Sequence, residues 1–280
     1  MADESKHFTW PSQFQHDGVT FFNFINPRVV KDQEIVKCRE DDVFVASYPK
    51  SGTTVMIEMV SLLMNGADIT ANLSSPQPAR VPMVEMYYKQ MTRYGWFYLL
   101  LNRILTLLLN HTTPSVYSMG DAGPPQFIRR SQSHRTNTNA EAHQNPPTVQ
   151  VIPETSSSEK LQVCYGDWFN HVLEWWDHKD DSNILFLKYE DLKKNPREVL
   201  RDTARFLDVR VTEEMEDVIL EHCSFRKMKE NKAVNFDQSR SFIRKGVIGD
   251  WRNNFTVAQN KEFEKMYQER MKGTDLDFEW

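Results

Sequence analysis

The feature that most constrains the fold is a buried-strand pattern followed directly by a tight loop and a helix pattern. Residues 42–48 form a short run of apolar and β-branched side chains, which is typical of a buried strand. A turn follows at residues 49–52, and apolar side chains then recur at the spacing of an amphipathic helix, namely Met56, Met59, Val60 and Leu63. The sequence therefore predicts a strand, a loop and a helix over residues 42–66, with Gly66 ending the helix.

The same alternation of strand and helix patterns continues in the second half of the chain. Residues 165–178 have the apolar spacing of a helix, and residues 184–188 form a second apolar run typical of a buried strand. Asn195 with Pro196 indicates the start of another helix, and Thr212 indicates the cap of a further one. We therefore predict an α/β fold, in which a parallel sheet is flanked by helices within a single domain.

Composition and charge exclude several classes of protein. Apolar residues make up 40% of the chain and charged residues 26%, which excludes disorder of the whole chain. The formal net charge of −5 argues against a nucleic-acid partner. The three cysteines, Cys38, Cys164 and Cys223, are far apart and odd in number, which predicts neither a disulfide framework nor a metal site. The N-terminus is polar and acidic without a signal-peptide pattern, so we expect a cytoplasmic protein.

The middle of the chain has weaker patterns. Residues 96–109 form an apolar run that Asn102 and Arg103 interrupt. The run is too short and too polar to span a membrane, so we predict a core or amphipathic helix and no membrane partner. Residues 110–160 are rich in Pro, Ser, Thr, Asn, Gln and His, which predicts a long irregular segment.

The loop between the first strand and its helix contains the residues that point most specifically to a chemical function. Free backbone N–H groups and the helix dipole at a helix start favour a bound anion. Lys50 adds a positive charge, and the hydroxyl groups of Ser51, Thr53 and Thr54 add hydrogen-bond donors. The loop has a single glycine, Gly52, and does not match the usual G-x-x-x-x-G-K-[ST] phosphate loop. The residues alone therefore leave two interpretations open: a phosphate site, or an ordinary capped helix with a surface lysine.

Residues 48–54, Tyr48-Pro49-Lys50-Ser51-Gly52-Thr53-Thr54, closely resemble the 5′-phosphosulfate loop of the cytosolic sulfotransferases. Residues 242–251 resemble the Arg-Lys-Gly…Gly-Asp-Trp segment of that family, and residues 187–192 and 223–228 are also similar to family segments. The resemblance covers about residues 15–90 and 161–280, with a divergent stretch over 91–160. It implies one sulfotransferase domain over residues 15–280 with a P-loop-like core.

The resemblance also implies an activity and a set of site residues. The family transfers a sulfuryl group from 3′-phosphoadenylyl sulfate (PAPS) to a hydroxyl or amine of a small-molecule acceptor, in line and without a metal. Lys50 would stabilise charge on the leaving phosphate. Val55 replaces the usual Trp, which should weaken nucleotide binding. The implied nucleotide-binding residues are Lys50, Ser51, Gly52, Thr53, Thr54 and Val55 in the loop, Tyr189, Cys223, Ser224, Phe225 and Met228 on the adenine side, and Phe242, Ile243, Arg244, Lys245 and Gly246 near the 3′-phosphate.

The divergent stretch lacks two further family segments. One is a Lys-Thr-His segment whose His is the general base, and the other is a strand that ends in Arg-Asn-x-Lys-Asp. His111 stands at about the right distance after Lys50 and is the candidate catalytic base, although an exposed loop histidine would look the same. Without the second segment we expect the sheet to lack an inner strand, so that the chain aggregates or exposes residues 110–160 to protease.

The sequence thus supports a PAPS-dependent sulfotransferase, with two alternatives. A chain without the usual base would still bind the sulfonucleotide but would be a catalytically impaired pseudoenzyme, because losing a general base typically costs about 10²–10⁴ in rate. A nucleotide kinase or NTPase is disfavoured, because the loop lacks the Walker Lys-Ser/Thr pair.

A last resemblance concerns self-association. Residues 252–261 resemble the short dimerisation segment of the family, with Phe255 and Val257 as its apolar centre. Lys261 stands where the family usually has Glu, so a two-fold contact would bring like charges together. We therefore expect a weak homodimer.

Overall fold

The centre of the molecule is a four-stranded parallel sheet in the order β4–β3–β5–β6. The strands are β3 (Val43–Ser47), β4 (Phe97–Leu100), β5 (Ser115–Met119) and β6 (Ile184–Lys188). A separate antiparallel hairpin joins β1 (Gln13–His16) and β2 (Val19–Phe22). The computed structural model describes residues 13–22, 25–31, 42–49, 51–81, 97–100, 115–119, 166–235, 243, 245–253 and 255–278.

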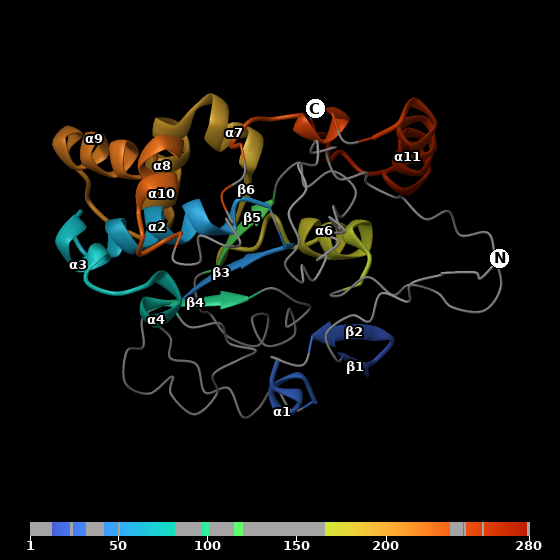
Figure 1. Ribbon diagram of the computed structural model, residues 1–280, viewed down its shortest axis with the longest axis horizontal. Coiled ribbons are helices and arrows are strands. Elements are labelled where there is room, and N and C mark those ends of the chain that lie inside the picture. The colour runs from blue at the N-terminus through green and yellow to red at the C-terminus, as the bar shows by residue number, and fades with distance from the viewer. Residues whose placement is uncertain are drawn as a thin grey trace, which may run out of the picture.

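Helices cover the sheet on both faces (Figure 1). In the first part of the chain they are α1 (Pro27–Lys31), α2 (Thr53–Met64), α3 (Ile69–Leu73) and α4 (Gln77–Arg80). In the second part they are α6 (Trp168–Trp176), α7 (Tyr189–Lys194), α8 (Pro196–Phe206), α9 (Glu213–His222), α10 (Phe225–Glu230), the 3-10 turn η3 (Asp250–Asn253) and α11 (Val257–Arg270). Within the described residues, no helix combines the length and the apolar composition that a membrane span needs.

The alternating side chains of β3 divide the core into two clusters. Phe44 and Ala46 pack with α6, α11 and the C-terminal segment, whereas Val43 and Val45 pack with α2, α8 and α9. Successive residues of a strand point to opposite faces, so a fully buried strand must be apolar on both. The result is a three-layer arrangement, with α6 and α11 on one side of the sheet and α2, α8 and α9 on the other (Figure 1).

The structure confirms the α/β fold class and most of the predicted elements. The strand, loop and helix of residues 42–66 are present, and the predicted apolar stripe of α2 is buried. Gly66 follows the end of α2 in the left-handed conformation, with φ +71°. Thr212 caps α9 by accepting a hydrogen bond from the Met215 N–H, whereas the Asn195 side chain makes no capping hydrogen bond to α8.

Two expectations about the middle of the chain are wrong. The run 96–109 was predicted to be helical, but its residues Phe97–Leu100 form strand β4, which pairs with β3. The segment 110–160 was predicted to be irregular, but Ser115–Met119 form strand β5. Because β5 pairs with both β3 and β6, the four described strands form a continuous sheet. The expected aggregation or protease sensitivity concerns residues 110–160, which lie outside the described residues except for β5.

Candidate active site

The loop after β3 is turned tightly onto the start of α2. The Ser51 N–H donates to the Tyr48 carbonyl at 3.3 Å, and Gly52 stands at the N-cap of α2 with φ +86°. The Gly52 carbonyl accepts from the N–H groups of Val55 and Met56 at 3.1 and 3.2 Å. In the part of the chain that the structure describes, the N–H groups of Gly52, Thr53 and Thr54 donate to no acceptor. Such a row of N–H groups at the positive end of a helix suits an anionic oxygen.

Three contacts hold this loop against the rest of the fold. The hydroxyl groups of Thr53 and Ser47 form a short hydrogen bond, which ties the helix start to the end of β3. The Gln77 side-chain amide donates to the Thr54 carbonyl at 3.0 Å. The Tyr48 hydroxyl donates to the Gly166 carbonyl at 3.0 Å. The Thr53 hydroxyl, which was expected to face an anion, is therefore directed toward the strand.

Tyr189 lies directly on the loop. It is the first residue of α7, immediately after β6, and parallel strands bring the end of β6 to the same sheet edge as the end of β3. A Cβ built on Gly52 would lie 2.5 Å from Cδ2 of the Tyr189 ring, so only glycine leaves room for the ring. The carboxyl edge of a parallel sheet is where ligands bind in open α/β folds. The predicted residues Gly52 and Tyr189 are thus brought together there.

The second predicted segment is built around α10. Cys223 is the C-cap residue that follows α9, Ser224 caps α10 by accepting from the Lys227 N–H, and Met228 is buried. Cys223 packs against the apolar cluster around α2. This desolvation, together with the negative charge of Glu58, raises the pKa of the Cys223 thiol well above its ordinary value, so it is a neutral contact residue.

Phe225 joins this segment to the distal loop. A Cβ built on Gly246, which has φ +67°, would lie 2.2 Å from Cδ2 of the Phe225 ring. Next to Gly246, the Lys245 ammonium group lies 2.7 Å from Oδ1 of the buried Asp250. The Asn253 side-chain amide donates to the same oxygen at 3.0 Å. The Arg-Lys-Gly and Gly-Asp-Trp halves of the motif are therefore linked by an ion pair that orients the loop.

Four of the predicted site residues, Lys50, His111, Phe242 and Arg244, lie outside the described residues. Ile243 and Val55 are described and partly buried. Ser47, which leads into the phosphate loop, pairs with Ser118, and Phe44 pairs with Ser115. Strand β5 therefore begins at the sheet edge opposite the phosphate loop.

One buried charged residue escaped the sequence interpretation. Glu58 lies on the apolar side of α2 with 0% of its surface exposed, in the middle of the run Val-Met-Ile-Glu-Met-Val. Buried carboxylates are rare unless they are paired, so a lone charge inside an apolar helix stripe was the available signal.

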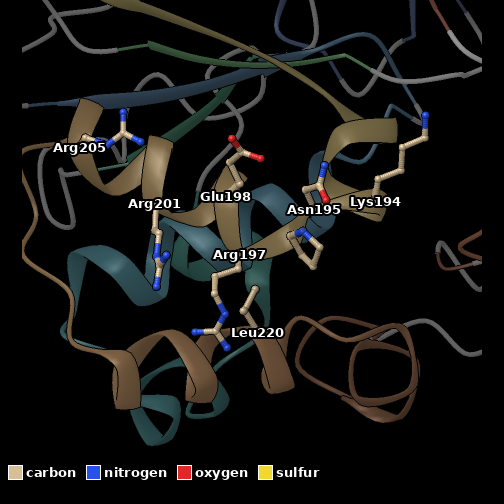
Figure 2. Close-up of a pocket in the computed structure, with 8 residues that line it drawn as sticks. Lys194, Asn195, Arg197, Glu198, Arg201, Arg205 and Leu220 are labelled. Carbon is tan, nitrogen blue, oxygen red and sulfur yellow. The ribbon is translucent and has the colours of Figure 1, made fainter.

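A groove between α8 and α9 lies apart from these loops (Figure 2). It is lined by Lys194, Asn195, Pro196, Arg197, Glu198, Arg201, Arg205 and Leu220. Arg197 and Arg201 extend from α8 toward α9, where each donates to the buried Glu216 carboxylate at 2.6 Å. Arg205 donates to Asp202. These arginine charges are already paired, so the groove is no strong anion site.

Comparison with known proteins identifies the family. The profile described as "Sulfotransferase domain" matches residues 40–152 and, in an overlapping second match, residues 131–275. Sulfotransferase 1B1 of the dog is 35% identical over 256 residues, which cover 86% of each chain. The chain belongs to the sulfotransferase family. Human sulfotransferase 1C2 is 32% identical over 264 residues, covering 86% of this chain and 87% of that protein.

Solved structures agree with the sulfotransferase fold. Mouse sulfotransferase SULT7A1, solved with PAP, superposes with a TM-score of 0.68 at 24% identity and covers 94% of this chain and 96% of its own. Retinol dehydratase, solved with retinol and PAP, gives a TM-score of 0.69 at 24% identity and covers 91% and 89% of the two chains. By family resemblance, this chain is a PAPS-dependent sulfotransferase.

Proposed function

We propose that this sulfotransferase transfers the sulfuryl group of PAPS to a hydroxyl or amine of a small-molecule acceptor. The observation that carries the proposal is the phosphate loop, where Gly52 lies beneath the Tyr189 ring at the carboxyl edge of the sheet. The PAP and retinol in the structure of retinol dehydratase support a sulfonucleotide donor and a small acceptor. We further propose a domain over residues 15–280 and a cytoplasmic location, as in the cytosolic members that the motifs resemble.

The proposed site would hold a nucleotide with phosphates at both ends. The N–H groups of residues 52–54 suit the 5′-phosphate, because they converge at the start of α2. Tyr189 and the segment 223–228 supply aromatic and apolar surface for an adenine ring. The loop at 244–246 is proposed to bind the 3′-phosphate. When bound, PAPS supplies the activated sulfuryl group, and Lys50 is proposed to stabilise charge that develops on the leaving phosphate.

The identity of the general base separates two functional outcomes. If His111 removes the acceptor proton, the chain is an active enzyme. If no base is in place, the chain binds the nucleotide and transfers the sulfuryl group slowly. The rate of the His111→Ala variant distinguishes the two outcomes.

Titration of the purified chain with PAP and with ATP tests the proposal. We expect PAP to bind more tightly than ATP, because only PAP carries a 3′-phosphate for the loop at 244–246. Preferential binding of ATP would instead support an NTPase. With PAPS and a panel of phenols, aliphatic alcohols and amines, His111→Ala should lower the rate about 10²–10⁴-fold if His111 is the base. An unchanged rate would exclude His111.

Arg244→Ala should weaken binding of PAP far more than binding of its 3′-dephospho analogue. A guanidinium group that forms two hydrogen bonds to a phosphate is lost in this variant, and hydrogen bonds to charged groups are worth about 1.5–3 kcal/mol each. Isothermal titration of both nucleotides measures the difference, and Arg28→Ala, an exposed arginine on α1, is the matched control. Equal losses for the two nucleotides would show that Arg244 does not bind the 3′-phosphate.

The segment 252–261 is proposed to form a weak homodimer. Thr256 caps α11, and Val257 at its first turn is 75% exposed, as a contact residue must be in the monomer. Lys261 is exposed on the same helix. Because the repulsion between copies is screened by salt, we expect association to tighten as ionic strength rises. Sedimentation at low and high salt measures this, and a strict monomer at tens of micromolar in both would exclude dimerisation through the segment.

A further inference from the structure

A buried polar cluster surrounds Glu58 on the inner side of α2. Its Oε1 accepts from the Gln77 amide at 2.8 Å and from the Arg80 guanidinium at 2.5 Å. Its Oε2 lies 3.1 Å from the Asn72 amide and 3.1 Å from Nε2 of His222. A carboxylate only accepts hydrogen bonds, so the His222 ring donates through Nε2. Each carboxylate oxygen thus has two donors, and the four donors come from three other helices.

The cluster keeps Glu58 charged inside the protein. Burial alone raises the pKa of the Glu58 carboxyl, but the hydrogen bond from His222 and the charge and hydrogen bonds of Arg80 and Gln77 outweigh burial and hold the pKa below its ordinary value. Replacing such a cluster by apolar residues often leaves stability unchanged or improves it, so stability alone is a weak reason for its presence.

The donors of the cluster also connect Glu58 to both proposed nucleotide-binding segments, one by a hydrogen bond and one through the chain itself. The Gln77 amide that binds Glu58 donates to the carbonyl of Thr54 in the phosphate loop at 3.0 Å. The Gln77 backbone N–H donates at 2.7 Å to the carbonyl of Ala233, which follows α10. His222 is the last residue of α9 and directly precedes the segment 223–228. One carboxylate therefore lies between the segment proposed for the 5′-phosphate and the segment proposed for the adenine.

We propose that Glu58 and His222 are positioning residues, which fix the distance between the phosphate loop and the adenine-binding segment. Glu58 acts on the loop through Gln77 and on the segment 223–228 through His222. The inference rests on the proposed function and deepens it, because it names residues that set nucleotide affinity without touching the nucleotide. A nucleotide that binds at both segments needs them at one spacing, and a loosened spacing lowers its affinity.

The test measures PAP affinity and the urea midpoint of unfolding for a small set of variants. His222→Leu removes the donor to Glu58, whereas His222→Gln keeps an amide N–H near the position of Nε2. Glu58→Gln removes the charge and keeps the shape. Glu216→Gln is the matched control, because Glu216 is also a buried carboxylate on α9 with two arginine partners, but it contacts neither nucleotide segment.

We expect Glu58→Gln and His222→Leu to weaken PAP binding about tenfold or more, which corresponds to about 1.4 kcal/mol. His222→Gln should restore affinity to within about threefold of the wild type. Glu216→Gln should lower the urea midpoint and leave PAP affinity unchanged. If Glu58→Gln does not fold, the pair of His222 variants decides the question.

The outcomes separate this inference from the proposed function. A wild-type chain that does not bind PAP contradicts the proposed function. A wild-type chain that binds PAP, with all three cluster variants binding equally well while their midpoints fall, shows that the cluster serves stability alone and overturns the inference. Equal affinities for His222→Leu and His222→Gln below that of the wild type would likewise exclude the hydrogen bond to Glu58 as the cause.

Discussion

Lys50→Ala is expected to lower the rate of sulfuryl transfer about 10²–10³-fold, the usual cost of removing one donor that stabilises developing charge. The loop geometry supports this expectation. Lys50 lies between Pro49, in the turn after β3, and the buried Ser51, whose N–H closes the turn on Tyr48. If the Lys50 side chain faces the helix start, its charge adds to the positive end of the helix, where charge on the leaving phosphate would develop.

Initial rates with PAPS and the best acceptor measure the effect, and titration with PAP separates binding from chemistry. We expect the loss mainly in kcat, because the lysine charge matters most in the transition state. Lys265→Ala is the control, since Lys265 is exposed on α11 with Glu269 as its partner at 3.9 Å. A Lys50→Ala enzyme with an unchanged rate would remove Lys50 from the mechanism.

The strand, loop and helix of residues 42–66 were predictable because each is set by local pattern. β3 is buried at every position and apolar except at Ser47, and the stripe of α2 has the helix period, so both signals come from residues close together in the sequence. The predicted helix caps show the limit of these local patterns. Thr212 caps α9 as its type suggests, but the side chain of Asn195 makes no capping hydrogen bond to α8. Local patterns therefore predict which element forms, but they do not predict every contact of its side chains.

Strands β4 and β5 were missed because their stability comes from distant partners. An apolar run such as 96–109 looks the same to periodicity whether it is a strand or a buried helix. Ser115–Met119 is short, and polar residues flank it, yet it pairs in register with both β3 and β6, which lie far away in the sequence. Whether such a segment forms a strand depends on its pairing partners elsewhere in the sheet. A short stretch of sequence therefore does not predict it.

The candidate site was predictable only in part, for a related reason. The motifs identified which residues belong to it, but the contacts of Gly52 with Tyr189 and of Gly246 with Phe225 join segments that are far apart in the chain. The Glu58 cluster is the extreme case. The partners of Glu58 lie on α3, α4 and α9. The pattern of α2 can therefore show that a charge lies on its apolar side, but it cannot show which side chains surround that charge.

Gly52→Ala is the second variant with a large expected effect. It combines an unfavourable backbone conformation with a steric clash, and both lower the free energy of unfolding. A residue with a Cβ at φ +86° costs about 1–2 kcal/mol relative to glycine. The new Cβ would also lie 2.5 Å from the Tyr189 ring, and forcing such atoms apart typically costs about 1–3 kcal/mol. We therefore expect the free energy of unfolding to fall by about 2–5 kcal/mol, with PAP binding weakened as the loop and the ring separate.

Gly66→Ala separates the two costs at the other end of the same helix. Gly66 has a similar φ of +71°, but a Cβ built there meets nothing within 4 Å. Urea unfolding should therefore show only the backbone cost, about 1–2 kcal/mol, and PAP binding should remain that of the wild type. If both glycine variants lose the same free energy, the close approach of Tyr189 to Gly52 contributes nothing.

A double-variant cycle with Tyr189→Ala tests the contact itself. Once the ring is removed, Gly52→Ala should cost no more than Gly66→Ala, because only the backbone conformation then opposes the alanine. The coupling free energy between positions 52 and 189 should accordingly equal the difference between the two glycine variants in the wild-type background. A coupling near zero would mean that the ring moves aside without cost, and glycine at position 52 would then be required by its φ angle alone.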